Sequence, residues 1–91
     1  MEIIILQGEK FTDREAAHSY LASALRLPDY YGRNLDALAD CLSERGPHTH
    51  IILTGANALR EALGDYGEKL IGVFLDCAAE PYSLHFAVDG E

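Results

Sequence analysis

The stretch LPDYYGRNLDALADCL, Leu27 to Leu42, places two tyrosines and a glycine directly before a predicted helix. Asn34 is a favourable N-cap for this helix, because its side-chain oxygen can accept a hydrogen bond from a backbone N–H of the first turn. The helix is expected to run to about Glu44, where the breaking sequence Arg45-Gly46-Pro47 follows. The stretch therefore predicts a tyrosine-rich loop that leads into a capped helix.

This helix carries an apolar stripe on one side and a row of acids on the other. At about 100° per residue the apolar side chains share one arc, and these are Leu35, Leu38, Cys41 and Leu42. Asp36, Asp40 and Glu44 lie on the opposite arc, with no Lys or Arg between Asn34 and Glu44. Like charges four residues apart repel by roughly 0.2–0.5 kcal/mol per pair, so the row is uncompensated.

An ordinary solvated face is the common explanation for such a row, but the preceding tyrosines favour a binding surface. Tyr30 and Tyr31 cannot both reach the core from so tight a turn, so at least one is expected at the surface. Tyrosine is enriched at binding hot spots, because it offers a large contact area at low entropic cost.

The flanking sequence predicts the remaining elements. Before the central helix, the apolar run Met1–Leu6 predicts a strand buried on both faces. Thr12 and Glu15 predict a capping box for a first helix that ends at Leu27-Pro28-Asp29. After the central helix, the predicted elements are a strand at Thr49–Leu53, a short helix at Ala58–Leu63, a last helix from Gly64 or Asp65 to about Glu80, and a third strand at Tyr82–Val88.

Strands separated by helical crossovers favour parallel pairing. The order β-α-α-β-α-α-β thus predicts one α/β domain over residues 1–91, with a single-layer three-stranded parallel sheet and about four helices. On the last helix, Asp76 and Glu80 stand opposite an apolar face formed by Leu70, Ile71, Phe74, Cys77 and Ala78. If the central and last helices lie side by side, their acids form one negative surface.

Composition limits the possible partners. The net charge is −8, from 15 acids and seven bases, which argues against nucleic acid or an anionic membrane and favours a basic partner or simple solubility. The apolar runs are too short for a membrane span, and no signal peptide is evident. Cys41 and Cys77 are therefore expected to be free thiols in a cytoplasmic protein.

Signals of catalysis are weak, and no cofactor is predicted. The turn at Thr54–Asn57 lacks the second glycine and the lysine of a phosphate loop. His48 and His50 flank a threonine without an evident third ligand, so no metal site is predicted. His18 has no identifiable acid–base partner, and His85 is expected to be an edge or hydrogen-bonded histidine in the third strand.

Taken together, the segment from Leu27 to Gly32, the run Asn34-Leu35-Asp36-Ala37-Leu38 and Asp40-Cys41-Leu42 resemble the signature of the barstar family of intracellular ribonuclease inhibitors. The opening strand followed by Gly8-Glu9 and the acidic last helix also match, so the resemblance covers essentially the whole chain. It implies a non-enzymatic protein that binds a basic, secreted, barnase-type ribonuclease as a 1:1 complex, with Asp40 standing in for an RNA phosphate. The partner-binding residues it implies are Tyr30, Tyr31, Gly32, Asn34, Asp36, Ala39, Asp40, Ser43, Glu44, Asp76 and Glu80.

This sequence departs from the family pattern at several positions of that surface. The chain has no Trp, and Ala39 stands where the family carries a tryptophan on the binding helix. Arg45 lies near the place of another interface aromatic, and Arg33 replaces an acid. The alternative is therefore an acidic antitoxin or interaction module whose basic partner is not a barnase-type ribonuclease.

Overall fold

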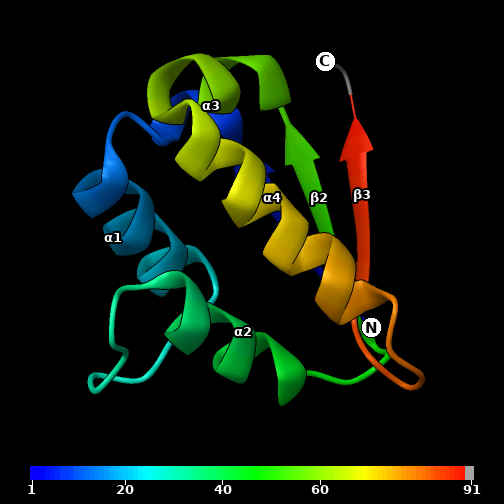
Figure 1. Ribbon diagram of the computed structural model, residues 1–91. Coiled ribbons are helices and arrows are strands. Elements are labelled where there is room, and N and C mark those ends of the chain that lie inside the picture. The colour runs from blue at the N-terminus through cyan, green and yellow to red at the C-terminus, as the bar shows by residue number, and fades with distance from the viewer. Residues whose placement is uncertain (90–91) are drawn as a thin grey trace.

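A computed structural model of the chain describes residues 1–89 (Figure 1). Along the chain the elements are β1 (Glu2–Gln7), the 3-10 turn η1 (Gly8–Lys10), α1 (Arg14–Ala24), α2 (Leu35–Ser43), β2 (Thr49–Thr54), α3 (Ala56–Leu63), α4 (Asp65–Ala78) and β3 (His85–Asp89). This order agrees with the one predicted from the sequence. Within the described residues, no helix combines the length and the apolar character that a membrane crossing requires.

The three strands form one parallel sheet in the order β1-β2-β3. Their register places Ile4, Ile51 and Phe86 side by side in one row across the sheet. The molecule measures 32 × 31 × 19 Å. The short dimension fits a sheet covered on one face by helices, each about 10 Å across. The predicted α/β fold with a single three-stranded parallel sheet is confirmed.

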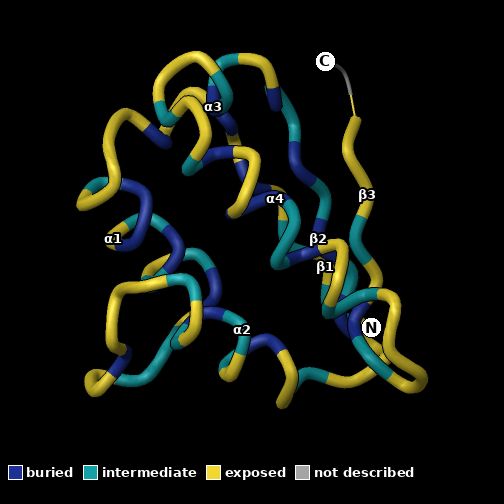
Figure 2. Tube along the Cα trace, viewed as in Figure 1, coloured by how far each residue is buried: buried dark blue, intermediate teal, exposed yellow. Residues whose placement is uncertain are grey.

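The hydrophobic core fills the space between the sheet and the helices. Strand β2 alternates strictly, so that Thr49, Ile51 and Leu53 are buried while the residues between them are half-exposed. Phe74 of α4 stacks on Phe86 of β3, with ring centroids 4.9 Å apart, which fixes α4 over this side of the sheet. In Figure 2, buried segments occur on α1, α2, α4 and β2, whereas most of β3 is exposed.

The prediction that β1 is buried on both faces is wrong. Ile3 and Ile5 are 60% and 56% exposed, whereas Leu6 is buried. The apolar run alone did not show that all four α-helices cover the same face of the sheet. The opposite face, called the outer face below, therefore remains open to solvent.

The predicted start of α1 is also wrong. The N-cap is Asp13 and not Thr12, because the carboxylate of Asp13 accepts a 2.8 Å hydrogen bond from the N–H of Ala16. Within the helix, Ala17, His18 and Leu21 are buried, whereas Ala16 is only half-buried. Aspartate and threonine are both good caps, so composition did not separate these two adjacent candidates.

Helix α1 ends at Ala24, earlier than the proline signal at Leu27-Pro28-Asp29 predicts. The backbone N–H of Leu27 donates to the carbonyl of Ala22 at 2.9 Å, and that of Arg26 donates to Ser23 at 3.3 Å. Arg26 adopts a left-handed conformation with φ 53°. These contacts form a Schellman motif, which ends the helix before the proline is reached.

Strand β3 begins at His85, three residues after the predicted start. Tyr82 lies in a turn with φ 60° and is 89% exposed, so it does not share the inner face with Leu84 and Phe86. Helix α3 begins two residues earlier than predicted, because Gly55 turns the chain in a left-handed conformation with φ 64°. Such a φ suits glycine, which lacks a Cβ.

Candidate partner-binding surface

The loop before α2 has one defined shape. The N–H of Tyr31 donates to the carbonyl of Pro28 at 2.9 Å, which closes a turn. Asn34 then caps α2 as predicted, because its side-chain oxygen accepts from the N–H of Ala37 at 2.8 Å. The amide nitrogen of the same side chain donates to the carbonyl of Gly32 at 3.2 Å. One side chain therefore joins the end of the loop to the start of the helix.

The two tyrosines of this loop have opposite environments. Tyr30 is 86% exposed, whereas Tyr31 is 7% exposed, which confirms that only one of them reaches the core. The Tyr31 hydroxyl forms a 2.5 Å hydrogen bond with Nδ1 of His18, and burial raises the pKa of Tyr31. Tyr30 is thus the tyrosine that a partner can contact, and Tyr31 holds the loop against α1.

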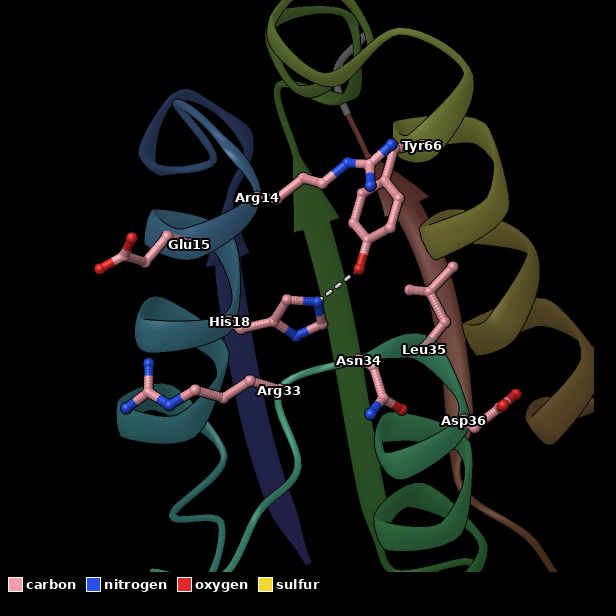
Figure 3. A pocket seen from close by; sticks show the side chains of 8 residues that line it. All are labelled: Arg14, Glu15, His18, Arg33, Asn34, Leu35, Asp36 and Tyr66. Atoms are coloured by element: carbon pink, nitrogen blue, oxygen red, sulfur yellow. Dashed lines mark hydrogen bonds between the residues drawn. The ribbon is translucent and has the colours of Figure 1, made fainter.

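His18 of α1 connects the loop, through Tyr31, with α4, through Tyr66; the bond to Tyr66 is drawn in Figure 3. It is 3% exposed, and its Nε2 forms a 2.6 Å hydrogen bond with the hydroxyl of Tyr66 on α4. A neutral imidazole suits this position, because it can donate to one tyrosine and accept from the other. Burial, and to a smaller extent the charge of Arg33, lower the pKa of His18.

The sequence alone indicated no partner for His18. Its two hydrogen-bond partners, Tyr31 and Tyr66, come close to it only in the folded protein. The apolar neighbours Ala17 and Leu21 indicate that position 18 borders the buried face of α1. Tyr31 and Tyr66 come from segments 13 and 48 residues away in the chain. No spacing rule relates such distant residues.

The space around His18 is a hollow of about 520 Å³ between α1, α4 and the start of α2. Figure 3 shows the guanidinium of Arg14 over the ring of Tyr66, at 4.2 Å from its centroid. The side chains of Glu15 and Arg33 point away from His18, and Arg33 donates instead to the hydroxyl of Ser19 at 2.8 Å. The charged groups do not converge on one point. We therefore interpret the hollow as a structural contact between three elements and not as a binding site.

The stability of the free protein should fall on acidification because of His18. Its pKa in the folded state lies below the unfolded value of about 6.5, so the unfolded chain binds more protons as the pH drops. The stabilisation is complete above about pH 6.5 and is lost below it, by at most about 1.4 kcal/mol per pH unit. We expect His18→Gln to reduce the difference between urea melts at neutral and acidic pH. His48→Gln, in an exposed loop, should leave the difference unchanged, and an equal loss in both variants would contradict this assignment.

The acids of α2 point outward, as predicted from the helical period. Asp36, Asp40 and Glu44 are all exposed, whereas Leu38 and Leu42 are fully buried. Exposure alone is compatible with an ordinary solvated face. The distinguishing feature is the arrangement of α2 next to α4.

Helices α2 and α4 pack against each other, and their C-terminal halves lie side by side (Figure 1). The thiol of Cys77 on α4 lies 3.8 Å from the carbonyl of Ala39 on α2. Asp76 and Glu80 flank this thiol in the chain and are both exposed. Burial raises the pKa of the thiol, and these two acids add to the effect. The exposed acids of these two neighbouring helices are together called the acidic face, defined as Asp36, Asp40, Glu44, Asp76 and Glu80.

Four of the five acids of the acidic face, all except Asp36 in the first turn of α2, lie at the less favourable ends of their helices. A helix dipole places partial negative charge at the C-terminus, where bases stabilise and acids destabilise by about 0.3–1 kcal/mol each. Neither α2 nor α4 carries a base in its last turn. Among residues 1–89, none of the three ion pairs involves the acidic face. The fold therefore holds this charge at a cost to its own stability.

Arg45, the base that follows α2 most closely, borders Asp40 and Glu44, but its guanidinium is bonded to other parts of the chain. Its guanidinium donates to the carbonyl of Leu25 and to the carboxylate of Glu2, the latter at 3.3 Å. Its side chain is only 19% exposed. Arg45 thus ties α2 to the end of α1 and to β1, and it leaves Glu44 without an ion-pair partner in the described chain.

A cleft of about 610 Å³ separates the loop from α2. Tyr30 and Gly32 line it on the loop side, and Asp40, Cys41 and Glu44 line it on the helix side. An exposed aromatic ring and two carboxylates thus line one concave surface, which Arg26 and Arg45 also border. Such a surface suits a cationic side chain, which gains from carboxylates and from an aromatic face alike.

The remaining residues of the predicted surface occupy supporting positions. Ala39 is half-buried between α2 and α4, and Gly32 packs so closely on Ala37 that an added Cβ would lie 3.2 Å from it. Ser43 donates its hydroxyl to the carbonyl of Asp40 at 2.7 Å, near the end of α2. Together with Asn34, these residues shape the surface around the acids.

Cys41 and Cys77 are free thiols, as predicted. Burial raises the pKa of both, and the nearby acids add to the effect. A raised pKa disfavours the thiolate, which is the nucleophilic form. Among residues 1–89, no group of three His, Cys, Asp or Glu side chains is placed to hold a metal ion.

Comparison with known proteins points to one family. The family model described as "Barstar (barnase inhibitor)" matches residues 1–89. A protein of Bacillus subtilis (strain 168), named "Putative ribonuclease inhibitor YrdF", is 38% identical over 82 residues, which cover 88% of this chain and 89% of that protein.

Proposed function

Because this chain belongs to the barstar family, we propose that it inhibits a basic ribonuclease by covering the active site of that enzyme. The observation that supports this proposal most directly is the acidic face. Four of its five carboxylates lie at or just beyond the C-terminal ends of two helices, where they lower stability, and all five lack ion-pair partners among residues 1–89. A basic ribonuclease supplies the missing positive charge, since its active site is built to bind RNA phosphates.

In this proposal Asp40 takes the place of a phosphate. It lies on the wall of the cleft, next to Glu44 and across from Tyr30. Its carboxylate has no hydrogen-bond or ion-pair partner among the described residues, so its acceptor sites are available to Arg, Lys or His groups of the enzyme. Charge-assisted hydrogen bonds of this kind are about twice as strong as neutral ones.

The other residues of the surface either contact the enzyme directly or hold the contacting residues in place in the same proposal. Tyr30 and Asp36 contact the enzyme beside Asp40, while Asp76 and Glu80 extend the contact from α4. Gly32 and Asn34 contribute backbone shape and the helix cap. Tyr31 acts indirectly, by holding the loop through His18.

The identity of the enzyme is a separate matter. Ala39 offers little contact area on α2, and Arg45 is engaged within the chain. The aromatic contacts of the family are therefore reduced here to exposed tyrosines, Tyr30 beside Asp40 and Tyr82 two residues after Glu80. These differences favour a target whose surface differs from that of a barnase-type enzyme. The second candidate is an antitoxin for another basic protein.

The proposal is tested by titrating the protein into several basic microbial ribonucleases while RNA cleavage is followed. For the cognate enzyme, cleavage should stop at one equivalent, which defines a 1:1 complex. A basic protein without nuclease activity, added in excess, should not relieve the inhibition. Binding without loss of cleavage would favour the second candidate. The function also implies a cytoplasmic location and no catalytic activity of the chain itself.

Association with the ribonuclease should depend strongly on salt. Raising the ionic strength from about 10 mM to about 1 M shortens the Debye length from about 30 Å to about 3 Å, which screens the acidic face. We expect the association rate to fall roughly 10- to 1,000-fold, with a much smaller change in the dissociation rate. Stopped-flow mixing at a series of salt concentrations measures both. A nearly constant association rate would show that the charge does not steer the encounter.

A further inference from the structure

Tyr82, in the turn between α4 and β3, is the most exposed tyrosine among residues 1–89, at 89%. Its ring and hydroxyl take part in no hydrogen bond, ring stacking or cation–π contact within this part of the chain. A single exposed apolar side chain is ordinary by itself. What distinguishes Tyr82 is the backbone conformation in which it is held.

The backbone of Tyr82 is left-handed, with φ 60°. This conformation brings Cβ close to the backbone carbonyl, so it is unfavourable for a bulky residue and is normally adopted by Gly, Asn or Asp. Among residues 1–89, the other non-glycine residues with positive φ are Arg26 and Arg33. Both have side-chain partners, since Arg26 lies 3.8 Å from the carboxylate of Glu2 and Arg33 donates to Ser19 at 2.8 Å. No comparable contact within the free protein accounts for a tyrosine at position 82.

The turn that carries Tyr82 is held at both ends. Before it, the N–H of Glu80 donates to the carbonyl of Cys77 at 3.3 Å, against the end of α4. Pro81 then restricts the backbone through its fixed φ. After it, Leu84 is 1% exposed and anchors the chain in the core. The ring is therefore presented on a short, anchored turn, which reduces the entropy lost when a partner binds it.

This turn lies at the same end of the molecule as most of the acidic face. It continues directly from α4, whose C-terminal half lies beside that of α2 (Figure 1). Strands β2 and β3 are parallel neighbours, so the segment after α2 and the turn after α4 enter the sheet at the same edge. Tyr30 borders the cleft with Asp40 and Glu44. The acidic face thus has one exposed tyrosine near α2 and another near the end of α4.

We infer that Tyr82 is a second aromatic contact of the partner-binding surface, and that its ring stacks on an arginine or lysine of the ribonuclease. The inference rests on the proposed inhibition of a basic ribonuclease. A cation over an aromatic ring is attracted by the ring quadrupole, and more strongly once water is excluded. Glu80, two residues earlier, provides a carboxylate for the same cation. The basic surface of the enzyme then extends from the groups that Asp40 contacts to the turn after α4.

The test compares inhibition constants for the cognate ribonuclease with thermal melts of the free variants. Tyr82→Ala removes the ring but keeps the backbone penalty, so inhibition should weaken roughly 3- to 30-fold with little change in Tm. Tyr82→Phe retains the ring and should inhibit within about 2-fold of the parent. Tyr82→Gly should weaken inhibition as alanine does and raise the Tm by about 2–8 °C, because glycine relieves the backbone. Ile3→Ala, at an exposed apolar position on the outer face, is the control and should inhibit like the parent.

A double variant shows whether Tyr82 and Glu80 contact the same cation. If they do, the variant carrying Glu80→Ala and Tyr82→Ala should lose less affinity than the product of the two single losses, and independent losses would contradict the shared cation. Equal inhibition by the parent and by Tyr82→Ala would overturn this inference alone and leave the proposed function standing. A Tyr82→Gly variant less stable than the parent would also overturn it, because the ring would then have a structural role. A parent that inhibits none of the basic ribonucleases overturns both.

Discussion

Asp40→Ala is expected to weaken the complex with the cognate ribonuclease by about 30-fold to about 5,000-fold, which corresponds to roughly 2–5 kcal/mol. Asp40 is exposed in the free protein and lines the cleft opposite Tyr30. In the proposed complex its carboxylate is desolvated against cationic groups of the enzyme. Its removal leaves those charges buried and unpaired, and this penalty dominates the loss. Most of the change should appear in the dissociation rate.

The same substitution should not destabilise the free protein. Asp40 lies between Asp36 and Glu44 at helical spacing and near the C-terminal end of α2. Alanine relieves like-charge repulsion and an unfavourable dipole contact, and it is a better helix former than aspartate. Urea melts should therefore show an unchanged or slightly higher free energy of unfolding. Opposite effects on binding and on stability are what separate a binding residue from a structural one.

Glu61→Ala is the matched control, since Glu61 is an exposed acid on α3, away from the acidic face. It should change the affinity by less than about 0.5 kcal/mol. Asp36→Ala should weaken binding in the same direction as Asp40→Ala but by a smaller factor. If Asp40→Ala inhibits the enzyme as tightly as the parent does, the acidic face is only a solvated surface and the proposed mechanism is wrong.

Gly8→Ala should be the most damaging single-methyl change in the fold. A Cβ at Gly8 would lie 1.9 Å from the carbonyl oxygen of Gly55 and 2.9 Å from that of Thr54, so two backbone segments meet at this point. Added methyl groups in tight sites typically cost about 1–3 kcal/mol. We expect about 3 kcal/mol or more here, because backbone on both sides cannot rotate away as a side chain would. This corresponds to a fall in Tm of roughly 12–24 °C for a domain of this size.

Gly72→Ala provides the control for this substitution. Gly72 lies inside α4, and a Cβ there would meet nothing within 4 Å. Alanine should therefore stabilise the helix by roughly 0.5–1 kcal/mol. Thermal and urea melts of the two variants should move in opposite directions. A Gly8→Ala variant as stable as the parent would mean that the ends of β1 and β2 can separate at little cost.

Local sequence patterns correctly predicted the features that depend on a single helix or on the order of the elements. The period of α2 separates Leu38 and Leu42 from the acids, and the structure buries and exposes them accordingly. Asn34 caps the helix because a cap needs only its own first turn. The alternation of helices and strands likewise led to the parallel sheet. Each of these features depends on residues a few positions apart, which the chain geometry fixes.

Where two neighbouring residues were equally suited to one role, only the structure showed which of them fills it. Thr12 and Asp13 are both suitable caps, and Tyr30 and Tyr31 are equally apolar, so composition ranked neither pair. The end of α1 was misplaced because a left-handed Arg26 is not expected from its residue type. In each case a contact from outside the segment selects one of two locally similar arrangements.

By itself, the sequence determined the order of the elements, the direction of the acids on α2 and the membership of the family. Only the tertiary structure decided that α2 packs against α4, that His18 bonds Tyr31 and Tyr66, and that His50 stacks on His85. It also decided that Ile3 and Ile5 face solvent. The physical reason is that helical and strand periods fix which side chains share a face. What covers that face depends on elements brought together from distant parts of the chain.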